Sequence, residues 1–378
     1  MSLNWYFPEE ILIEILSRVP VKSLCRFTLV SKTWYEFITN PTFISVHLNH
    51  TLNTLDHQEH RSILLRRFFR HSNDHYTLIR PDSFHPSTSD IVFSHASDEP
   101  SFRIVGSSNG LLCFVPDLFD GVDQAVLWNP SISRSIHLPR ATVRPSWPHL
   151  AVFGMGVDSA TSDCKLVRIV LARINQYFGF ARLQSPEAEL YSLKTNTWKR
   201  LVEPDIRCRI MQFSWTPVMF KGCPHWLAYR RRENGLKNLV LTFDMNGEVF
   251  KEIMVPDDLG RGNRVKLCPN LFSDTLTLVK YNVAPNVWTC NIWVMKEYGV
   301  FGTWTTIYTF DLIGGMERII GFQEDEGVLL ATRVGNELVL YDIKTTTIKN
   351  IGMVGFASSF HVNRYVESLI LLKNRLLE

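Results

Sequence analysis

The chain has 378 residues, of which 45% are hydrophobic and 12% aromatic, and its formal net charge at pH 7 is only +3. This length allows a large buried core and is too great for one small domain, while the aromatic content excludes a disordered chain. The weak positive charge disfavours a dedicated nucleic-acid-binding protein, which usually carries a concentrated basic face. We therefore expect a folded protein of more than one part, with partners other than nucleic acid.

The seven cysteines are spread along the chain, and no two of them form a CxxC pair. This usage argues against a disulfide framework and against a cysteine-based zinc site. The sequence has no HExxH, GxSxG or P-loop motif, no signal-peptide pattern, and no uncharged apolar run near the ~20 residues of a membrane helix. We expect a reduced cytoplasmic or nuclear protein without cofactor, metal or membrane contact, and without catalytic activity of its own.

The first forty residues predict three short helices. Apolar residues over 11–19 recur at helical spacing, Pro8 suits the first helical position, and Pro20 ends the pattern. Weaker patterns predict further helices over 23–29 and 30–38. Domains below about 40 residues usually need a metal, a disulfide or a partner to be stable. The apolar surface of these helices therefore either caps the rest of the chain or binds another protein.

The segment FPEEILIEILSRVPVKSLCRFTLVSKTW, which begins at Phe7, resembles an F-box, with Phe7 where the motif usually has Leu. The resemblance implies docking onto a Skp1-like adaptor and, through it, onto a cullin–RING ubiquitin ligase. Carried over by position, the residues that would form or support this interface are Pro8, Ile11, Leu12, Ile15, Leu16, Pro20, Val21, Leu24, Val30 and Trp34. Of these, Ile11 and Trp34 could equally belong to the interior of the three helices.

The remainder of the chain contains an internal repeat. Five segments align and begin 48 to 63 residues apart: WNPSISRSIHL, YSLKTNTWKRL, FDMNGEVFKEI, WVMKEYGVFGTWTTI and YDIKTTTIKNI. Each reads as a β-hairpin, and one or two apolar strands precede it. Three or four strands in every ~50 residues are typical of a kelch-like propeller blade. The ~310 residues after the helices thus predict about six blades, with seven left open because residues 81–103 are hard to assign.

The sixth blade is predicted to combine strands from both ends of the chain. Residues 62–69 and 76–80 read as two strands that lack the repeat, and residues 359–362 and 365–372 read as two more. Combining them completes one blade, closes the ring and removes the free sheet edges that promote aggregation.

A second resemblance covers nearly the whole chain. The motifs GSSNGLLCF, LWNPS, FGMGVDSATSDCKLVRI, GCPHWLA and YVESLILL resemble the F-box-associated, kelch-like domain of plant F-box proteins, a group that includes the S-locus F-box-like proteins. Cys164 stands where that family often has Tyr. The expected fold is a small all-α F-box over 1–45, a helical linker over 46–60, and an all-β propeller over 61–378.

Contacts with a target protein are expected on the loops of the propeller, because loops vary without harming a rigid scaffold and Arg and aromatic residues are frequent interface anchors. The candidates are Trp147, Arg173, Tyr177, Phe178, Arg182, Arg230 and Arg231. Each of them could equally pack against its own blade.

Three functions remain open at this point. The resemblance favours a substrate-recognition subunit of a Skp1–cullin–F-box ubiquitin ligase, in which the F-box docks the adaptor and the propeller binds an unknown target protein. A propeller enzyme or glycan-binding protein with a helical cap is the alternative from a different class. The third is an F-box protein that acts in a complex without the ligase.

Overall fold

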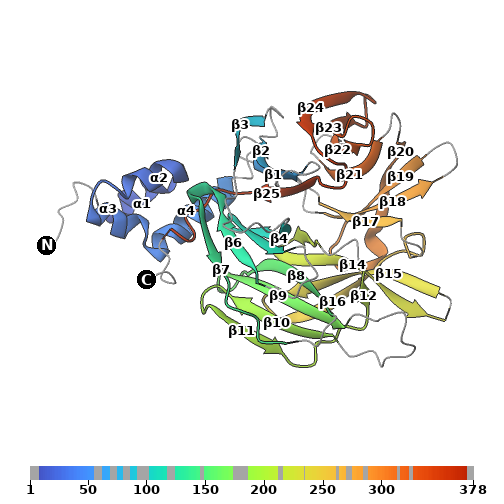
Figure 1. Ribbon diagram of the computed structural model, residues 1–378, viewed down its shortest axis with the longest axis horizontal. Coiled ribbons are helices and arrows are strands. Elements are labelled where there is room, and N and C mark those ends of the chain that lie inside the picture. The colour runs from blue at the N-terminus through green and yellow to red at the C-terminus, as the bar shows by residue number, and fades with distance from the viewer. Residues whose placement is uncertain are drawn as a thin grey trace.

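The protein is described here by a computed structural model, which defines residues 8–54, 62–68, 75–79, 86–91, 102–116, 124–144, 149–172, 186–211, 216–233, 235–260, 264–269, 275–283, 288–312, 316–322 and 327–372. Helices come first in the chain and strands follow, and Figure 1 shows the helices together at one side of a ring of sheets. The all-α region followed by an all-β region was predicted correctly.

Four helices form the N-terminal region: α1 (Glu9–Ser17), α2 (Val21–Phe27), α3 (Lys32–Ile38) and α4 (Pro41–Thr54). The three helices expected in the first forty residues are present, but their bounds differ from the prediction. Helix α1 covers Glu9–Ser17 rather than 11–19, and Pro8 is its N-cap rather than its first helical residue. Pro20 adopts an extended N-cap conformation, so α2 begins at once after it rather than at residue 23. The hydroxyl of Ser31 accepts a hydrogen bond from the Trp34 amide at 3.3 Å, and this cap starts α3 two residues later than predicted.

Helix α4 follows α3 after a short connection and packs against α1 and α3. The side-chain oxygen of Asn40 accepts a hydrogen bond from the Thr42 amide at 2.9 Å, and Pro41 occupies the first helical position. His47 of α4 lies 3.0 Å from the carbonyl oxygen of Val19, at the end of α1. These contacts join the four helices into one unit.

Six antiparallel sheets form the propeller, and we number them as blades I to VI. Blade I consists of β25 (His361–Tyr365), β1 (Ser62–Arg67), β2 (His75–Ile79) and β3 (Pro86–Ile91). Blade II consists of β4 (Phe102–Ser108), β5 (Leu111–Pro116), β6 (Val126–Asn129) and β7 (Arg134–His137), with the 3-10 turn η2 (Pro130–Ile132) between the last two. Blade III consists of β8 (His149–Asp158), β9 (Asp163–Ala172), β10 (Glu187–Ser192) and β11 (Thr197–Leu201).

The other three blades repeat this arrangement with one addition. Blade IV consists of β12 (Arg209–Ile210), β13 (Val218–Phe220), β14 (Cys223–Arg232), β15 (Gly235–Asp244) and β16 (Val249–Met254). Blade V consists of β17 (Val265–Cys268), β18 (Leu276–Val283), β19 (Trp288–Met295) and β20 (Trp304–Asp311), with the 3-10 turn η4 (Phe301–Thr303) before β20. Blade VI consists of β21 (Met316–Phe322), β22 (Gly327–Thr332), β23 (Glu337–Asp342) and β24 (Ile348–Val354).

The five repeated segments of the sequence are the last two strands of five blades: β6–β7, β10–β11, β15–β16, β19–β20 and β23–β24. The apolar strand that precedes each of them is the second strand of the same blade. Six blades, rather than the alternative of seven, account for the sheets. Buried side chains of neighbouring blades pack together around the ring, so each blade covers the apolar face of the next.

Closure of the ring differs from the prediction in which strands each end supplies. The C-terminal strand β25 pairs with β1 in antiparallel register, from Ser62 opposite Tyr365 to Arg66 opposite His361. The N-terminal side supplies three strands rather than two, because residues 86–91 form β3. The C-terminal side supplies one strand rather than two, because residues 366–372 leave the sheet after β25. A shared sixth blade was therefore predicted correctly, and its two-plus-two composition was wrong.

Candidate functional site

The helical region presents apolar side chains to solvent. Ile11 and Ile15 lie one turn apart on α1 and are 42% and 52% exposed. Leu29 and Val30, in the connection between α2 and α3, are also strongly exposed. An isolated exposed apolar residue is ordinary, but several on one small region mark a site of protein contact.

The structure divides the residues predicted to form or support the adaptor interface. Five of them are exposed: Pro8, Ile11, Ile15, Pro20 and Val30. Four are buried: Leu12, Leu16, Val21 and Leu24. Trp34 is partly buried, and its ring meets that of Phe27 edge to face with 5.6 Å between centroids. The question left open by the sequence is thus answered for Ile11, which lies at the surface, and for Trp34, which lies partly inside.

The interior of the helical region is completed by the C-terminal tail, residues 366–372. Leu369 is fully buried and Leu372 is nearly so, and both belong to the same hydrophobic cluster as Leu16 of α1, Leu24 of α2 and Phe43 of α4. The helices therefore bury part of their apolar surface against a segment that follows the last blade. They are attached to the propeller through this tail and also directly, because α2 contacts η2 of blade II and Ile132 packs against the same cluster.

Asn129, at the end of β6, holds the tail in place from the propeller side. Its side-chain amide nitrogen donates hydrogen bonds to the carbonyl oxygens of Ser368 at 2.9 Å and Ile370 at 2.7 Å. Its side-chain oxygen accepts a hydrogen bond from the Ser131 amide at 3.0 Å. Asn129 and Ser368 are fully buried, so the Asn129 amide and the Ser368 carbonyl would otherwise lack a hydrogen-bond partner away from water.

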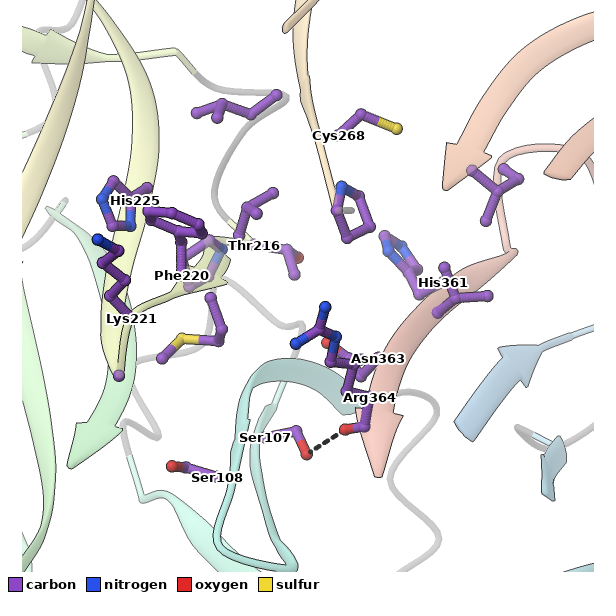
Figure 2. Close-up of a pocket in the computed structure, with 18 of the residues that line it drawn as sticks. Ser107, Ser108, Thr216, Phe220, Lys221, His225, Cys268, His361, Asn363 and Arg364 are labelled. Carbon is purple, nitrogen blue, oxygen red and sulfur yellow. Dashed lines mark hydrogen bonds between the residues drawn. The ribbon is translucent and has the colours of Figure 1, made fainter. Parts of the chain in front are cut away.

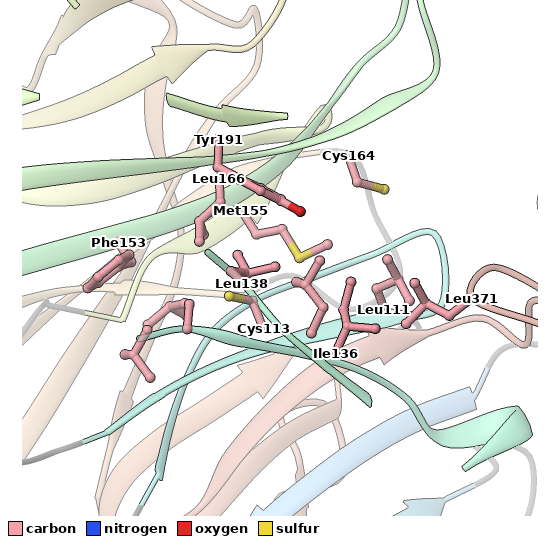
Figure 3. Packing of buried hydrophobic residues seen from close by; sticks show 14 residues of the cluster. Leu111, Cys113, Ile136, Leu138, Phe153, Met155, Cys164, Leu166, Tyr191 and Leu371 are labelled. Atoms are coloured by element: carbon pink, nitrogen blue, oxygen red, sulfur yellow. The ribbon is translucent and has the colours of Figure 1, made fainter. Parts of the chain in front are cut away.

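Between the two leucines that pack in the helical region, the tail contacts the propeller through Ile370 and Leu371. Leu371 packs in a cluster between blades II and III with Leu111, Cys113 and Leu166 (Figure 3). Gly110 permits the close approach of the tail, since it has a φ of +77° and a Cβ there would lie 2.7 Å from the Val366 carbonyl oxygen. The tail is thus packed on both sides, against the helices and against the propeller.

His225 of β14 is a second buried polar residue that the sequence gave no reason to select. Its Nδ1 lies 3.0 Å from the Cys223 carbonyl oxygen and its Nε2 lies 2.7 Å from the Tyr298 hydroxyl. A neutral imidazole meets both contacts, because Nδ1–H donates to the carbonyl and Nε2 accepts from the hydroxyl. Burial lowers the pKa of His225 to about 4, so the residue stays neutral in the folded protein well below pH 6.5.

The protonation of His225 is consequently expected to make the folded protein less stable as the pH falls. Because the folded pKa is depressed, the unfolded chain binds the proton first, and stability is lost as pH falls from about 6.5 toward 4. The loss at pH 5 is expected to be about 2 kcal/mol from this residue. Chemical denaturation at pH 7 and pH 5 should show a difference that His225→Gln reduces, whereas substitution of the exposed His137 by Gln leaves it unchanged. An equal difference in the wild type and His225→Gln would contradict this assignment.

The residues predicted to contact a target protein fall into two groups. Outside the described residues lie Trp147, Arg173, Tyr177, Phe178 and Arg182. Arg230 and Arg231 lie on β14, close to the point where this strand turns into β15. The Arg230 guanidinium contacts both carboxylate oxygens of Glu252 on β16, at 2.5 and 2.6 Å, while Arg231 is exposed.

In the described part of the chain, no three His, Cys, Asp or Glu side chains are grouped so that they could hold a metal ion. Nor does any described helix have the length and hydrophobicity needed to span a bilayer. All seven cysteines carry free thiols.

Comparison with protein families gives two matches that cover most of the chain. The F-box domain model matches residues 6–45, and the model of the F-box associated beta propeller domain matches residues 68–372. The chain belongs to the F-box proteins that carry an F-box associated propeller. The helical region is therefore the F-box, and the two resemblances noted in the sequence are confirmed.

Relatives of this F-box protein are known in Arabidopsis thaliana. F-box protein At5g49610 is 30% identical over 93% of each chain, and F-box protein CPR1 is 27% identical over 96% of this chain and 88% of its own. F-box/kelch-repeat protein At3g23880 is 26% identical over 89% of this chain and 87% of its own. Among solved structures, a chain of a nidogen/laminin complex matches with a TM-score of 0.45 at 10% identity, over 82% of this chain and 99% of that chain, which is too distant to support any argument.

Proposed function

We propose that the protein is a substrate-recognition subunit of a Skp1–cullin–F-box ubiquitin ligase. In this role the F-box docks a Skp1-like adaptor, the adaptor links to a cullin–RING ligase, and the propeller binds a target protein. The protein itself carries out no chemistry. It raises the effective concentration of the target beside a ubiquitin-charged enzyme and sets its orientation.

The observation that carries this proposal is the exposure of Ile11 and Ile15 on an F-box whose interior is already filled. Leu12 and Leu16, on the adjacent face of the same helix, are buried, and Leu369 of the tail completes that interior. The exposed pair therefore has no remaining role in packing the four helices. An apolar surface with this placement suits a protein partner, and the family points to the Skp1-like adaptor.

The tail gives the proposed receptor a defined geometry. A receptor whose two parts were joined by a loose linker would present its target over a wide range of positions. Here Asn129 and the leucines of the tail tie the F-box to blade II. A fixed angle between adaptor and target would favour ubiquitin transfer to lysines on one side of the target. We place this activity in the cytoplasm or the nucleus.

The proposal is tested by reconstitution with purified components. The full chain is mixed with a Skp1-like adaptor and a cullin–RING pair, and the assembly is followed by size-exclusion chromatography with light scattering. We expect one receptor to bind one adaptor and to recruit the cullin through it. A folded receptor that does not bind the adaptor would refute the proposal, and a receptor that binds the adaptor without the cullin would support the ligase-independent alternative.

A further inference from the structure

The centre of the propeller contains a cavity of about 510 Å³. Its walls include residues of all six blades, on β25, β4, β8, β13, β14, β17 and β21. Leu52 of α4 also contributes, so the cavity reaches the F-box side of the ring. Lys221, which follows β13, and Arg364, on β25, extend from opposite sides of it (Figure 2). A cavity of this size can accept a small organic molecule.

The charge in this cavity has one sign. Four cationic residues line it: Lys221, Lys266, Arg318 and Arg364. Among the described residues that line it there is no aspartate or glutamate. A concave site lined by charges of one sign focuses the electrostatic potential and attracts ligands of the opposite charge.

Two of these cationic residues, Lys266 and Arg318, lie on the neighbouring strands β17 and β21. No described carboxylate lies within ion-pair distance of either side chain. Burial, followed by repulsion from Arg318, lowers the pKa of Lys266, and the exposed Glu317 acts against this more weakly. Burial also lowers the pKa of Arg318. Two partly buried cations that have no carboxylate partner among the described residues reduce stability, a cost that functional sites often show.

The contacts that these cations do make fix their positions without neutralising their charge. The Arg318 guanidinium donates hydrogen bonds to the carbonyl oxygens of Phe360 and Ser358. The Lys266 ammonium lies 5.6 Å from the centre of the Tyr281 ring. Carbonyl groups and an aromatic ring orient a cation but carry no negative charge. An anion that enters the cavity would therefore meet charges that are already in place.

Other lining residues indicate what the rest of the ligand looks like. Ser107 and Ser108 place hydroxyl groups at the end of β4, where the Ser107 hydroxyl donates to the Arg364 carbonyl oxygen at 3.2 Å (Figure 2). Apolar side chains, including Phe220, Leu267 and Ile320, form much of the remaining wall. Such a wall suits a ring or another apolar body attached to the anionic group.

We propose that the central cavity binds an organic phosphate, with its phosphoryl group at Lys266 and Arg318 and its apolar body against Leu267 and Ile320. A phosphate carries up to two negative charges and several acceptor oxygens, so it matches a pair of cations better than a single carboxylate does. The phosphoryl group can belong to a free small molecule or to a phosphorylated side chain of a bound protein. This proposal rests on the residues of the cavity and not on the proposed binding of an adaptor.

The experiment measures binding of phenyl phosphate to the full chain by calorimetry and by thermal shift, at low and high salt. We expect saturable binding that weakens as salt rises, a higher melting temperature with ligand, and at least a tenfold loss of affinity in Lys266→Gln. Lys349→Gln removes the same charge from an exposed position on β24 and is expected to bind as the wild type does. Without ligand, Lys266→Gln is expected to melt at the same or a higher temperature, since it relieves the repulsion with Arg318.

Three results would overturn the proposal: no binding of phenyl phosphate, equal binding by the wild type and Lys266→Gln, or equal affinity for benzoate. If Lys266→Gln does not fold, Lys221→Gln, at an exposed position on the other side of the cavity, serves as the second test and is expected to weaken binding less. The two sources are then separated. A free ligand appears as an added mass in native mass spectrometry of the wild type, whereas a phosphorylated target is captured in a phosphatase-sensitive way. Both the added mass and the phosphatase-sensitive capture are expected to be lost in Lys266→Gln.

Discussion

Removal of residues 366–378 is expected to weaken the attachment of the F-box to the propeller and to destabilise its interior while the ring stays closed. The truncated chain keeps all of β25, so each residue that pairs with β1 remains. It loses the buried side chains of Leu369, Leu371 and Leu372, which together contribute about 5 kcal/mol or more by burial. Most of this loss falls on the F-box, because Leu369 and Leu372 pack in its interior.

Hydrogen exchange measured by mass spectrometry reports the two regions separately. Amides of α1 to α4 are expected to exchange much faster in the truncated protein, whereas those of β1 and β25 remain protected. Removal of residues 373–378 alone retains every contact described for the tail and serves as the matched control. Unchanged protection of the F-box after the longer truncation would show that the tail does not hold it.

A point substitution tests the same junction without shortening the chain. Asn129→Ala removes four hydrogen bonds and leaves the buried Ser368 carbonyl and the partly buried Ile370 carbonyl without that partner, a cost of about 1–3 kcal/mol for the buried group. Asn350→Ala removes one hydrogen bond, to the Gly352 amide, at an exposed position and is expected to cost well under 1 kcal/mol. Equal stability of the two variants would contradict the role given to Asn129.

The conformation of the tail could not be predicted from its sequence pattern alone. The segment YVESLILL is rich in apolar residues and was interpreted as a second C-terminal strand. A strand buried on both faces and an irregular segment packed between two domains have the same local pattern, and the tail ends in a turn in which Leu371 has a φ of 72°. What separates them here is the partner: Asn129 and Gly110 lie far away in the sequence and receive the tail from blade II.

The prediction omitted strand β3 of blade I for a different reason. Residues 86–91 read PSTSDI, and most of these residue types have weak strand preference. The segment is β3, which pairs only with β2 at the outer end of its sheet, so tertiary pairing rather than local preference determines its conformation. In contrast, the five hairpins repeat aromatic residues and turns at a regular spacing, and this made six blades predictable from the sequence.

The grouping of charged side chains inside the molecule could not be predicted for a related reason. Lys266, Arg318 and Arg364 belong to three different blades, and each resembles any solvent-facing residue of a strand. Only ring closure brings them to one cavity. The same holds for Arg168 and Glu189, which form a buried ion pair at 2.5 Å between β9 and β10. The F-box could be recognised from sequence because its motif is local, but the division of its apolar residues into surface and interior required the fold.

That division determines the sharpest test of adaptor binding. Leu16→Asp would be the obvious substitution from sequence alone, but Leu16 is 4% exposed and packs against the tail, so a charge there is expected to unfold the F-box. Ile15, its neighbour on α1, is 52% exposed, and Ile15→Asp is expected to change the free energy of unfolding by less than about 1 kcal/mol. Loss of adaptor binding in Ile15→Asp therefore reports on the interface rather than on folding.

The expected effect of Ile15→Asp is a loss of about three decades of adaptor affinity, because an unpaired charge buried in an apolar interface costs several kcal/mol. Ile348→Asp introduces the same charge at a residue that is 54% exposed on β24, and this control is expected to bind the adaptor normally. Since Ile15 lies near the C-terminal end of α1, where a negative charge is unfavourable, Ile15→Lys repeats the test with the opposite charge. Calorimetric titration with purified adaptor measures all three variants, and wild-type affinity in both Ile15 variants would place the adaptor interface elsewhere on the protein.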